Sequence, residues 1–231
     1  MPEDEEAPPT PYQALRALAS EKVRVTDTYE HVETYTLGGL LTTLWHWPTD
    51  GEVRGVVVAC GGAMGGLLGP CGGLYHDLGV TLVEHGIATV RVGWRKPNDM
   101  DRCLHDMLAT LELAARRGAP KAITMGHSFG GAPAIQAGVV VEDFVCGVAT
   151  FATQSAGCEV AGGLQGRPVL CFHGDADELL PEACSHLVAE LSGGEVVLLP
   201  GAGHMLTPDE GVIRSRLARW IPETLACEPA G

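Results

Sequence analysis

The stretch 121–134, KAITMGHSFGGAPA, is the feature that most constrains how this chain can fold. An apolar run leads into GHSFGG (126–131), and helix-forming residues follow. This order predicts a buried strand, a tight turn and a helix start, with Ser128 at the apex. Glycines two residues before and two after Ser128 are a steric requirement, because so sharp a turn leaves no room for neighbouring Cβ atoms. The simpler alternative is a glycine-rich turn whose serine caps the helix.

Length and composition indicate one folded domain. The 231 residues are enough for a full core. Glycine contributes 31 of them, about twice its usual share, and the glycines cluster at predicted strand ends, as tight loops over a sheet require. The net charge of −14 and the pI of 4.9 argue against nucleic-acid or anionic-membrane partners.

The cysteines and the N-terminus favour a cytoplasmic protein. No basic segment followed by an apolar core begins the chain, so no secretory signal is expected. Cys60, Cys146 and Cys171 lie in apolar β-like runs, where cysteine behaves as a small hydrophobe. A Cys60–Cys71 bridge across one glycine loop is the alternative. No Cys or His spacing matches a zinc site, so no metal is expected.

The first 75 residues contain three stretches of different composition. Residues 1–19 are acidic and proline-rich, then helix-prone from residue 12, and predict a mobile tail with one short helix before a single domain over residues 20–231. Between residues 22 and 47, apolar and polar residues alternate, which predicts half-buried antiparallel strands. The uncharged stretch 55–75 has the length of a membrane span, but its glycines and Pro70 predict a strand and a loop instead.

From residue 55 onward, continuous apolar runs alternate with helical patterns. This alternation predicts an α/β fold: a mostly parallel, doubly wound sheet of about eight strands, helices on both faces, and the first strands antiparallel. Functional loops in such sheets gather at the carboxyl ends of the strands, and Ser128 lies at one of these ends.

Two later strands end in loops that supply an acid and a base. HGDADELLP (173–181) follows the strand 168–172, and PGAGH (200–204) follows the strand 195–199. A serine nucleophile needs a base within reach and an acid that orients the base. The order serine, aspartate, histidine, each after its own strand, is that of the α/β-hydrolase arrangement.

With GHSFGG, HGDADELLP and PGAGH, the chain resembles the α/β-hydrolase superfamily over residues 22–225, especially compact capless serine esterases and dienelactone-hydrolase-like proteins. The resemblance implies Ser128 as nucleophile, Asp177 as acid and His204 as general base. It favours Asp177 over Asp175, because the family pattern Gly-x-x-Asp falls on residues 174–177.

Three other residues compete for these roles. Asp175 is expected to shape its loop as an Asx-type turn. His173 ends a strand and is expected to be a hydrogen-bonded structural histidine. His127 is next to Ser128, but neighbours on so sharp a turn are expected to point apart.

The oxyanion hole is expected to combine the N–H of Phe129 with an N–H from the loop after the strand 55–60. Many relatives have His-Gly at this point, whereas this chain has Cys60 followed by Gly61 and Gly62. This departure keeps a main-chain N–H available as a donor, but it leaves open which residue of the loop supplies it. Gly62 is the expected donor and Ala63 the alternative, and a loop without a donor role is the simpler hypothesis.

The site is expected to be shallow and open. Only residues 152–167 separate two strands at the place where relatives insert a cap, so no cap domain is predicted. Seven residues are expected to wall the site, each with plain packing as the alternative: Met64, Leu67, Trp94, Phe129, Gln154, Leu179 and Met205. Such walls suit short uncharged acyl groups. Arg91, Arg95 and Lys96 are candidates for binding an anionic substrate, but solvated or helix-capping roles are expected.

The sequence therefore predicts a serine-dependent carboxylesterase that forms an acyl-enzyme, acts on a small-molecule ester and needs no cofactor. Thioester, lactone or dienelactone and peptide hydrolysis, or acyl transfer, are alternatives on the same triad. A non-catalytic ligand-binding member of the fold is a different class of alternative. The oligomeric state is not readable from the sequence.

Overall fold

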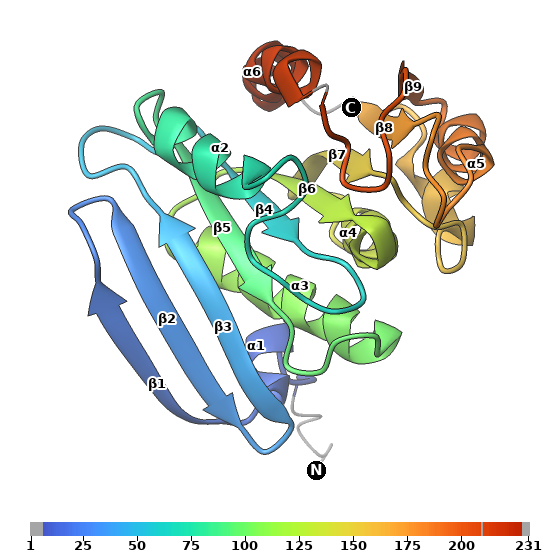
Figure 1. The fold of residues 1–231 in the computed structure, drawn as a ribbon. Helices are drawn as coiled ribbons and strands as arrows, with labels where there is room; N and C mark the ends of the chain where they lie inside the picture. Colours follow the sequence, from blue (N-terminus) through green and yellow to red (C-terminus); the bar gives the residue numbers. More distant parts are fainter. Residues whose placement is uncertain (1–6, 209, 228–231) are drawn as a thin grey trace.

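Nine strands form one sheet in the order β1-β2-β3-β5-β4-β6-β7-β8-β9 in the computed structural model, which describes residues 7–208 and 210–227 (Figure 1). The strands are β1 (Ala17–Arg24), β2 (Tyr29–Thr36), β3 (Gly39–His46), β4 (Gly55–Cys60), β5 (Ile87–Gly93), β6 (Ala122–His127), β7 (Val145–Phe151), β8 (Val169–Gly174) and β9 (Glu195–Leu199). The helices are α1 (Pro11–Ala14), α2 (Leu74–Val83), α3 (Met100–Arg116), α4 (Gly131–Val140), α5 (Ala183–Ser192) and α6 (Glu210–Ala226), with 3-10 turns η1 (Ser128–Gly130) and η2 (Glu159–Leu164).

Both faces of the central parallel strands, β4 to β8, are covered, whereas the edge strand β9 is partly exposed. Every residue of β4 is buried. Val56 and Val58 pack in one apolar cluster with residues of α3, α4 and α5, whereas Val57 and Ala59 pack in a second cluster with residues of α2 and α6. Burial on both faces explains why β4 reads as a continuous apolar run instead of an alternating one.

The first three strands are antiparallel, as expected, and they extend the sheet beyond β5. All eight residues of the edge strand β1 are exposed. The helix expected from residue 12 to 19 is shorter: α1 ends at Ala14, and residues 17–19 belong to β1. The expected tail boundary at residue 19 therefore falls inside a strand. The acidic residues 1–6, expected to be mobile, lie outside the described residues.

The candidate site lies where the order of the strands in the sheet changes direction relative to their order in the sequence. β4 pairs with β5 on one side and with β6 on the other, all parallel. The loops that follow β4 and β6 therefore lie next to each other at the carboxyl ends of the strands, where open α/β sheets bind ligands.

Nothing large is inserted between β7 and β8, where only η2 and its flanking loops lie. Among the described residues, no helix is both long and apolar enough to cross a membrane.

Candidate active site

Ser128 lies at the turn between β6 and α4 in a strained backbone conformation. Its φ is 56°, in the left-handed region that residues with a Cβ rarely adopt. A Cβ on Gly126 would collide with the Gly130 carbonyl oxygen, and a Cβ on Gly130 would collide with the Gly61 carbonyl oxygen. The glycines on either side of the serine are therefore required by the close approach of main chains, as the sequence predicts.

Asp177 and His204 lie in the loops after β8 and β9 and are directly hydrogen-bonded. His204 Nδ1 lies 2.8 Å from Asp177 Oδ2. The Asp177 side chain is fully buried, and that of His204 is 15% exposed. Because Nδ1–H donates to the carboxylate, Nε2 is the nitrogen left to accept a proton. The pair therefore forms an oriented base.

Hydrogen bonds keep Asp177 ionised despite its burial. Burial alone raises the pKa of this carboxyl, but bonds from the Leu180 N–H, from His204 and from the Leu179 N–H outweigh it, so the pKa lies below its ordinary value. The two amides donate to Oδ1 at 3.0 and 2.8 Å respectively. The carboxylate thus serves His204 through one oxygen and its own loop through the other.

Asp175, the competing acid, points elsewhere. Its Oδ1 accepts a hydrogen bond from the Gly201 N–H at 2.6 Å, and the residue is exposed. The sequence predicts that Asp175 shapes its own loop through an Asx-type turn, whereas the observed bond reaches the loop after β9. Asp175 therefore links the acid loop to the base loop.

His173 is a buried structural histidine, as expected. Its Nε2 donates to the Leu180 carbonyl oxygen at 3.0 Å, so its Nδ1 accepts from the Ser185 hydroxyl at 2.7 Å. The same Nε2 is 3.4 Å from Asp177 Oδ2. His173 therefore stabilises the loop that carries Asp177, and both of its ring nitrogens are already engaged.

His127 has a contact that sequence reasoning missed. Its Nε2 lies 3.0 Å from the main-chain oxygen of His204, and the two imidazole centroids are 4.9 Å apart. The two residues are 77 positions apart in sequence, and no local pattern reveals such a contact. Burial, as the largest cause, lowers the pKa of His127 from 6.5 to about 4, so the ring is neutral at physiological pH.

Ser128 itself faces the loop after β4. A Cβ built on Gly62 would lie 3.3 Å from Ser128 Cβ and 3.7 Å from its Oγ. Within the described part of the chain, Ser128 Oγ makes no hydrogen bond, a common state of a nucleophile without substrate. The side-chain arrangement thus brings Gly62 to Ser128 and pairs Asp177 with His204.

Gly62, the expected oxyanion donor, is fixed through its carbonyl oxygen. This oxygen accepts from the Trp94 indole N–H at 3.3 Å and from the Gly65 N–H at 2.9 Å. Phe129, which supplies the other expected amide, is the second residue of η1, and its side chain is buried. Whether the amide of Gly62 or that of Ala63 faces the oxyanion stays a prediction.

The seven expected wall residues separate into two groups. Met64, Leu179 and Met205 are 94%, 72% and 47% exposed, and each lies within two residues of Gly62, Asp177 or His204 in sequence. The others are more enclosed: Trp94 and Phe129 are buried in the core, and Leu67 and Gln154 are half-buried. Trp94 therefore supports the loop instead of lining an open wall.

The three candidate cations are engaged elsewhere. Arg95 forms an ion pair with the buried Asp106, and Lys96 Nζ lies 3.0 Å from Asp99 Oδ2. Arg91 is 2% exposed, and its guanidinium donates to the Leu67 carbonyl oxygen at 3.4 Å. None of these side chains is therefore placed as an exposed, unpaired cation beside Ser128.

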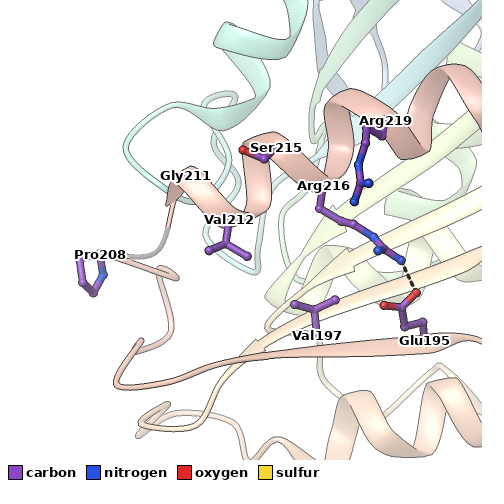
Figure 2. Close-up of a pocket in the computed structure, with 8 residues that line it drawn as sticks. All are labelled: Glu195, Val197, Pro208, Gly211, Val212, Ser215, Arg216 and Arg219. Carbon is purple, nitrogen blue, oxygen red and sulfur yellow. Dashed lines mark hydrogen bonds and ion pairs between the residues drawn. The ribbon is translucent and has the colours of Figure 1, made fainter.

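Other features of the surface lie away from the serine. A groove of about 1010 Å³ runs between β9 and α6, where Arg216 pairs with Glu195 (Figure 2). Its lining contains none of Ser128, Asp177 and His204, so the groove is separate from the candidate site. None of the eight cysteines, all within the described residues, forms a disulfide, so the alternative of a Cys60–Cys71 bridge is not realised. In residues 7–208 and 210–227, no cluster of three or more His, Cys, Asp or Glu side chains is arranged to hold a metal ion.

Known structures share this fold at low sequence identity. Est1E from Butyrivibrio proteoclasticus is 18% identical with a TM-score of 0.73, covering 85% of this chain and 99% of Est1E; another structure of Est1E contains ferulic acid. A dienelactone hydrolase from Anabaena variabilis is 15% identical, TM-score 0.69, covering 88% of this chain and 98% of that one. XC6422 from Xanthomonas campestris, described as a serine hydrolase without lid, is 16% identical, TM-score 0.65, covering 90% of this chain and 100% of that one.

No protein-family model matches the sequence, and no curated protein matches it either. The likeness therefore lies in the three-dimensional arrangement of the chain, which these structures match over 85–90% of its length. This chain has the α/β-hydrolase fold, in its capless form.

Proposed function

We propose that this protein is a serine hydrolase that cleaves carboxylic esters with small, uncharged acyl groups. The observation that carries the proposal is the 2.8 Å hydrogen bond between His204 and the buried Asp177, at the end of the sheet where Ser128 occupies a strained turn. A strained serine supported by glycines on both sides is difficult to explain as a simple helix cap, because a cap needs no left-handed conformation.

In the proposed reaction, Ser128 Oγ attacks the ester carbonyl carbon while His204 Nε2 takes the hydroxyl proton. Asp177 holds the imidazole and stabilises its charged form. The amide of Phe129 and that of Gly62 or Ala63 stabilise the oxyanion. His204 then protonates the departing alcohol, and water, deprotonated by the same nitrogen, releases the acid and regenerates Ser128. These steps require neither a metal nor an organic cofactor.

The preference for uncharged acyl groups rests on the surroundings of the serine. Three exposed apolar side chains, Met64, Leu179 and Met205, lie within two residues of Gly62, Asp177 or His204 in sequence, and the exposed charged residues beside Asp177, Asp175 and Glu178, are both acidic. Arg95 and Lys96 are already paired with carboxylates. An anionic substrate would therefore find no unpaired cation among these candidates, whereas an apolar acyl group would bury surface.

Alternatives on the same triad are thioester, lactone or dienelactone and peptide hydrolysis, and acyl transfer. A ligand-binding protein without turnover is the alternative of a different class. We further propose a cytoplasmic protein with a small-molecule ester as partner and no nucleic-acid or membrane partner. The eight cysteines, none of which forms a disulfide, and the net charge of −14 support this.

A fluorophosphonate probe tests the proposal. We expect labelling of the wild type and none of Ser128→Ala. Equal labelling of both would remove Ser128 from the mechanism, and a folded wild type that is not labelled would favour the ligand-binding alternative.

A substrate panel then tests the acyl preference. It should contain p-nitrophenyl esters of increasing chain length, a ferulate ester, a thioester, a lactone and a peptide. The highest kcat/KM is expected for a short uncharged ester. The ferulate ester is included because Est1E has been crystallised with ferulic acid.

A further inference from the structure

We propose that His127 is a positioning residue that fixes the general base relative to the nucleophile, an inference that rests on the proposed function. The bond that carries it joins His127 Nε2 to the main-chain oxygen of His204 at 3.0 Å. A carbonyl oxygen can only accept, so Nε2 carries the proton and donates. The elbow that holds Ser128 is thereby connected directly to the backbone of the base.

The contact depends on the position of His127 at the end of β6. His127 is the last residue of β6, with an extended backbone (φ −102°, ψ 136°), and Ser128 after it turns to φ 56°. The two side chains have different neighbours: the Ser128 hydroxyl oxygen lies 3.7 Å from the position of a Cβ built on Gly62, whereas the His127 ring contacts the main chain of His204. The buried His127 ring, 7% exposed, reaches the loop after β9 instead of solvent.

Other bonds hold the base loop, but each reaches an element other than the nucleophile elbow. The Gly201 N–H donates to Asp175, and the Ala202 carbonyl accepts from the Ala176 N–H at 3.1 Å. The Met205 carbonyl accepts from the Cys71 N–H at 3.0 Å. Among the hydrogen bonds that this loop makes within the described residues, the bond from His127 is the one that fixes His204 relative to the residue beside Ser128.

The consequence for catalysis is geometric. Asp177 fixes the rotation of the His204 ring through Nδ1, but the position of Nε2 also depends on where the His204 backbone lies. A misplacement of about 1 Å in such a site costs on the order of 10²-fold in rate. Because the effect is on proton transfer and not on substrate contacts, kcat should fall while KM changes little.

Three variants separate this role from simple packing. His127→Phe keeps a ring of similar volume but removes the donor. His127→Gln places an amide nitrogen near the former Nε2 and can restore the bond. His105→Phe is the matched control: its Nε2 also donates to a main-chain carbonyl, that of Pro11, at 2.7 Å, but it joins α3 to α1 away from the site.

Activity towards a p-nitrophenyl ester, fluorophosphonate labelling rate and thermal melting should be measured on each protein. We expect kcat and labelling rate to fall about 10- to 100-fold in His127→Phe, with KM within about 3-fold of wild type. His127→Gln should recover most of the loss, and His105→Phe should keep kcat near the wild-type value.

Folded His127→Phe with wild-type kcat would overturn the inference, as would His127→Gln no more active than His127→Phe although both melt cooperatively. Failure of the proposed function is a separate result, because the wild type would then be unlabelled or Ser128→Ala would still be labelled. If His127→Phe does not fold, the comparison of His127→Gln with wild type decides: near-wild-type kcat supports the inference, and a 10-fold or larger loss contradicts it.

Discussion

Asp175 and Asp177, two residues apart in one loop, hold the base loop at two different points. Asp175 binds the Gly201 N–H at 2.6 Å, and Asp177 binds His204 Nδ1 at 2.8 Å. The first bond joins an exposed carboxylate to the main chain, whereas the second is made by a buried carboxylate to a side chain. Two carboxylates of one loop therefore have separable roles, one in orienting the base and one in shaping its loop.

Asp177→Asn and Asp175→Asn are expected to have very different effects on activity. An amide at position 177 presents the wrong group to Nδ1, so kcat should fall on the order of 10³- to 10⁴-fold with a folded protein. Asp175→Asn still offers an amide oxygen to Gly201, so kcat should fall less than about 10-fold. Steady-state kinetics of both variants check this, and similar losses would contradict the assignment of the acid.

Gly126→Ala is expected to prevent stable folding. The added Cβ would meet the main-chain oxygen of Gly130, which cannot move without opening the turn. Overpacking against backbone costs more than the ~1–3 kcal/mol typical of side-chain overpacking. Gly211→Ala is the control, because no atom lies within 4 Å of the new Cβ in α6; it should be neutral or stabilising by up to about 1 kcal/mol. Chemical denaturation of both variants tests the contrast.

Trp94→Phe is expected to lower kcat without unfolding the protein. It keeps most of the buried ring but removes the indole N–H that donates to the Gly62 oxygen. Loosening the loop should weaken oxyanion stabilisation and lower kcat about 10-fold, since loss of a whole oxyanion donor costs about 10²–10³. Trp45→Phe loses a similar buried indole bond, to Thr43 Oγ1 at 2.7 Å, in β3. Equal kcat in the two variants would leave Trp94 with a packing role alone.

The parts of the site that sequence predicts are those dictated by the local chain. The glycines around Ser128 follow from the sharp turn, and the placing of the loops that carry Ser128, Asp177 and His204 at one edge of the sheet follows from their position after parallel strands. The buried parallel strands can also be predicted from the sequence, because burial on both faces requires continuous apolar runs.

The parts that sequence missed depend on contacts between distant segments. Residues 17–19 are alanine and leucine, good helix formers, yet pairing with β2 makes them a strand. The partner of His127, the main-chain oxygen of His204, is 77 residues further along the chain. The hydrogen bond from the Trp94 indole N–H to the Gly62 oxygen likewise joins segments 32 residues apart, and no local pattern reveals it.

Stability should fall as the pH is lowered from about 6.5 to about 4. Burial, as the largest cause, lowers the pKa of both His46 and His127 from 6.5 to about 4. For His46, the nearby Arg91 guanidinium and His76 lower it further. Between these values the unfolded chain binds protons that the folded chain does not, so the free energy of unfolding rises with pH across this window.

The loss is expected to be about 2–3 kcal/mol per histidine when the pH falls from neutral to 4. Below about pH 4, protonation of Asp177, whose pKa is also lowered, adds to the loss. His46→Gln removes one titrating group outside the site, so its free energy of unfolding should depend less on pH than that of the wild type. Urea titrations of both proteins at pH 7, 5.5 and 4.5 measure the difference, and parallel pH dependences would show that His46 is not protonated on unfolding.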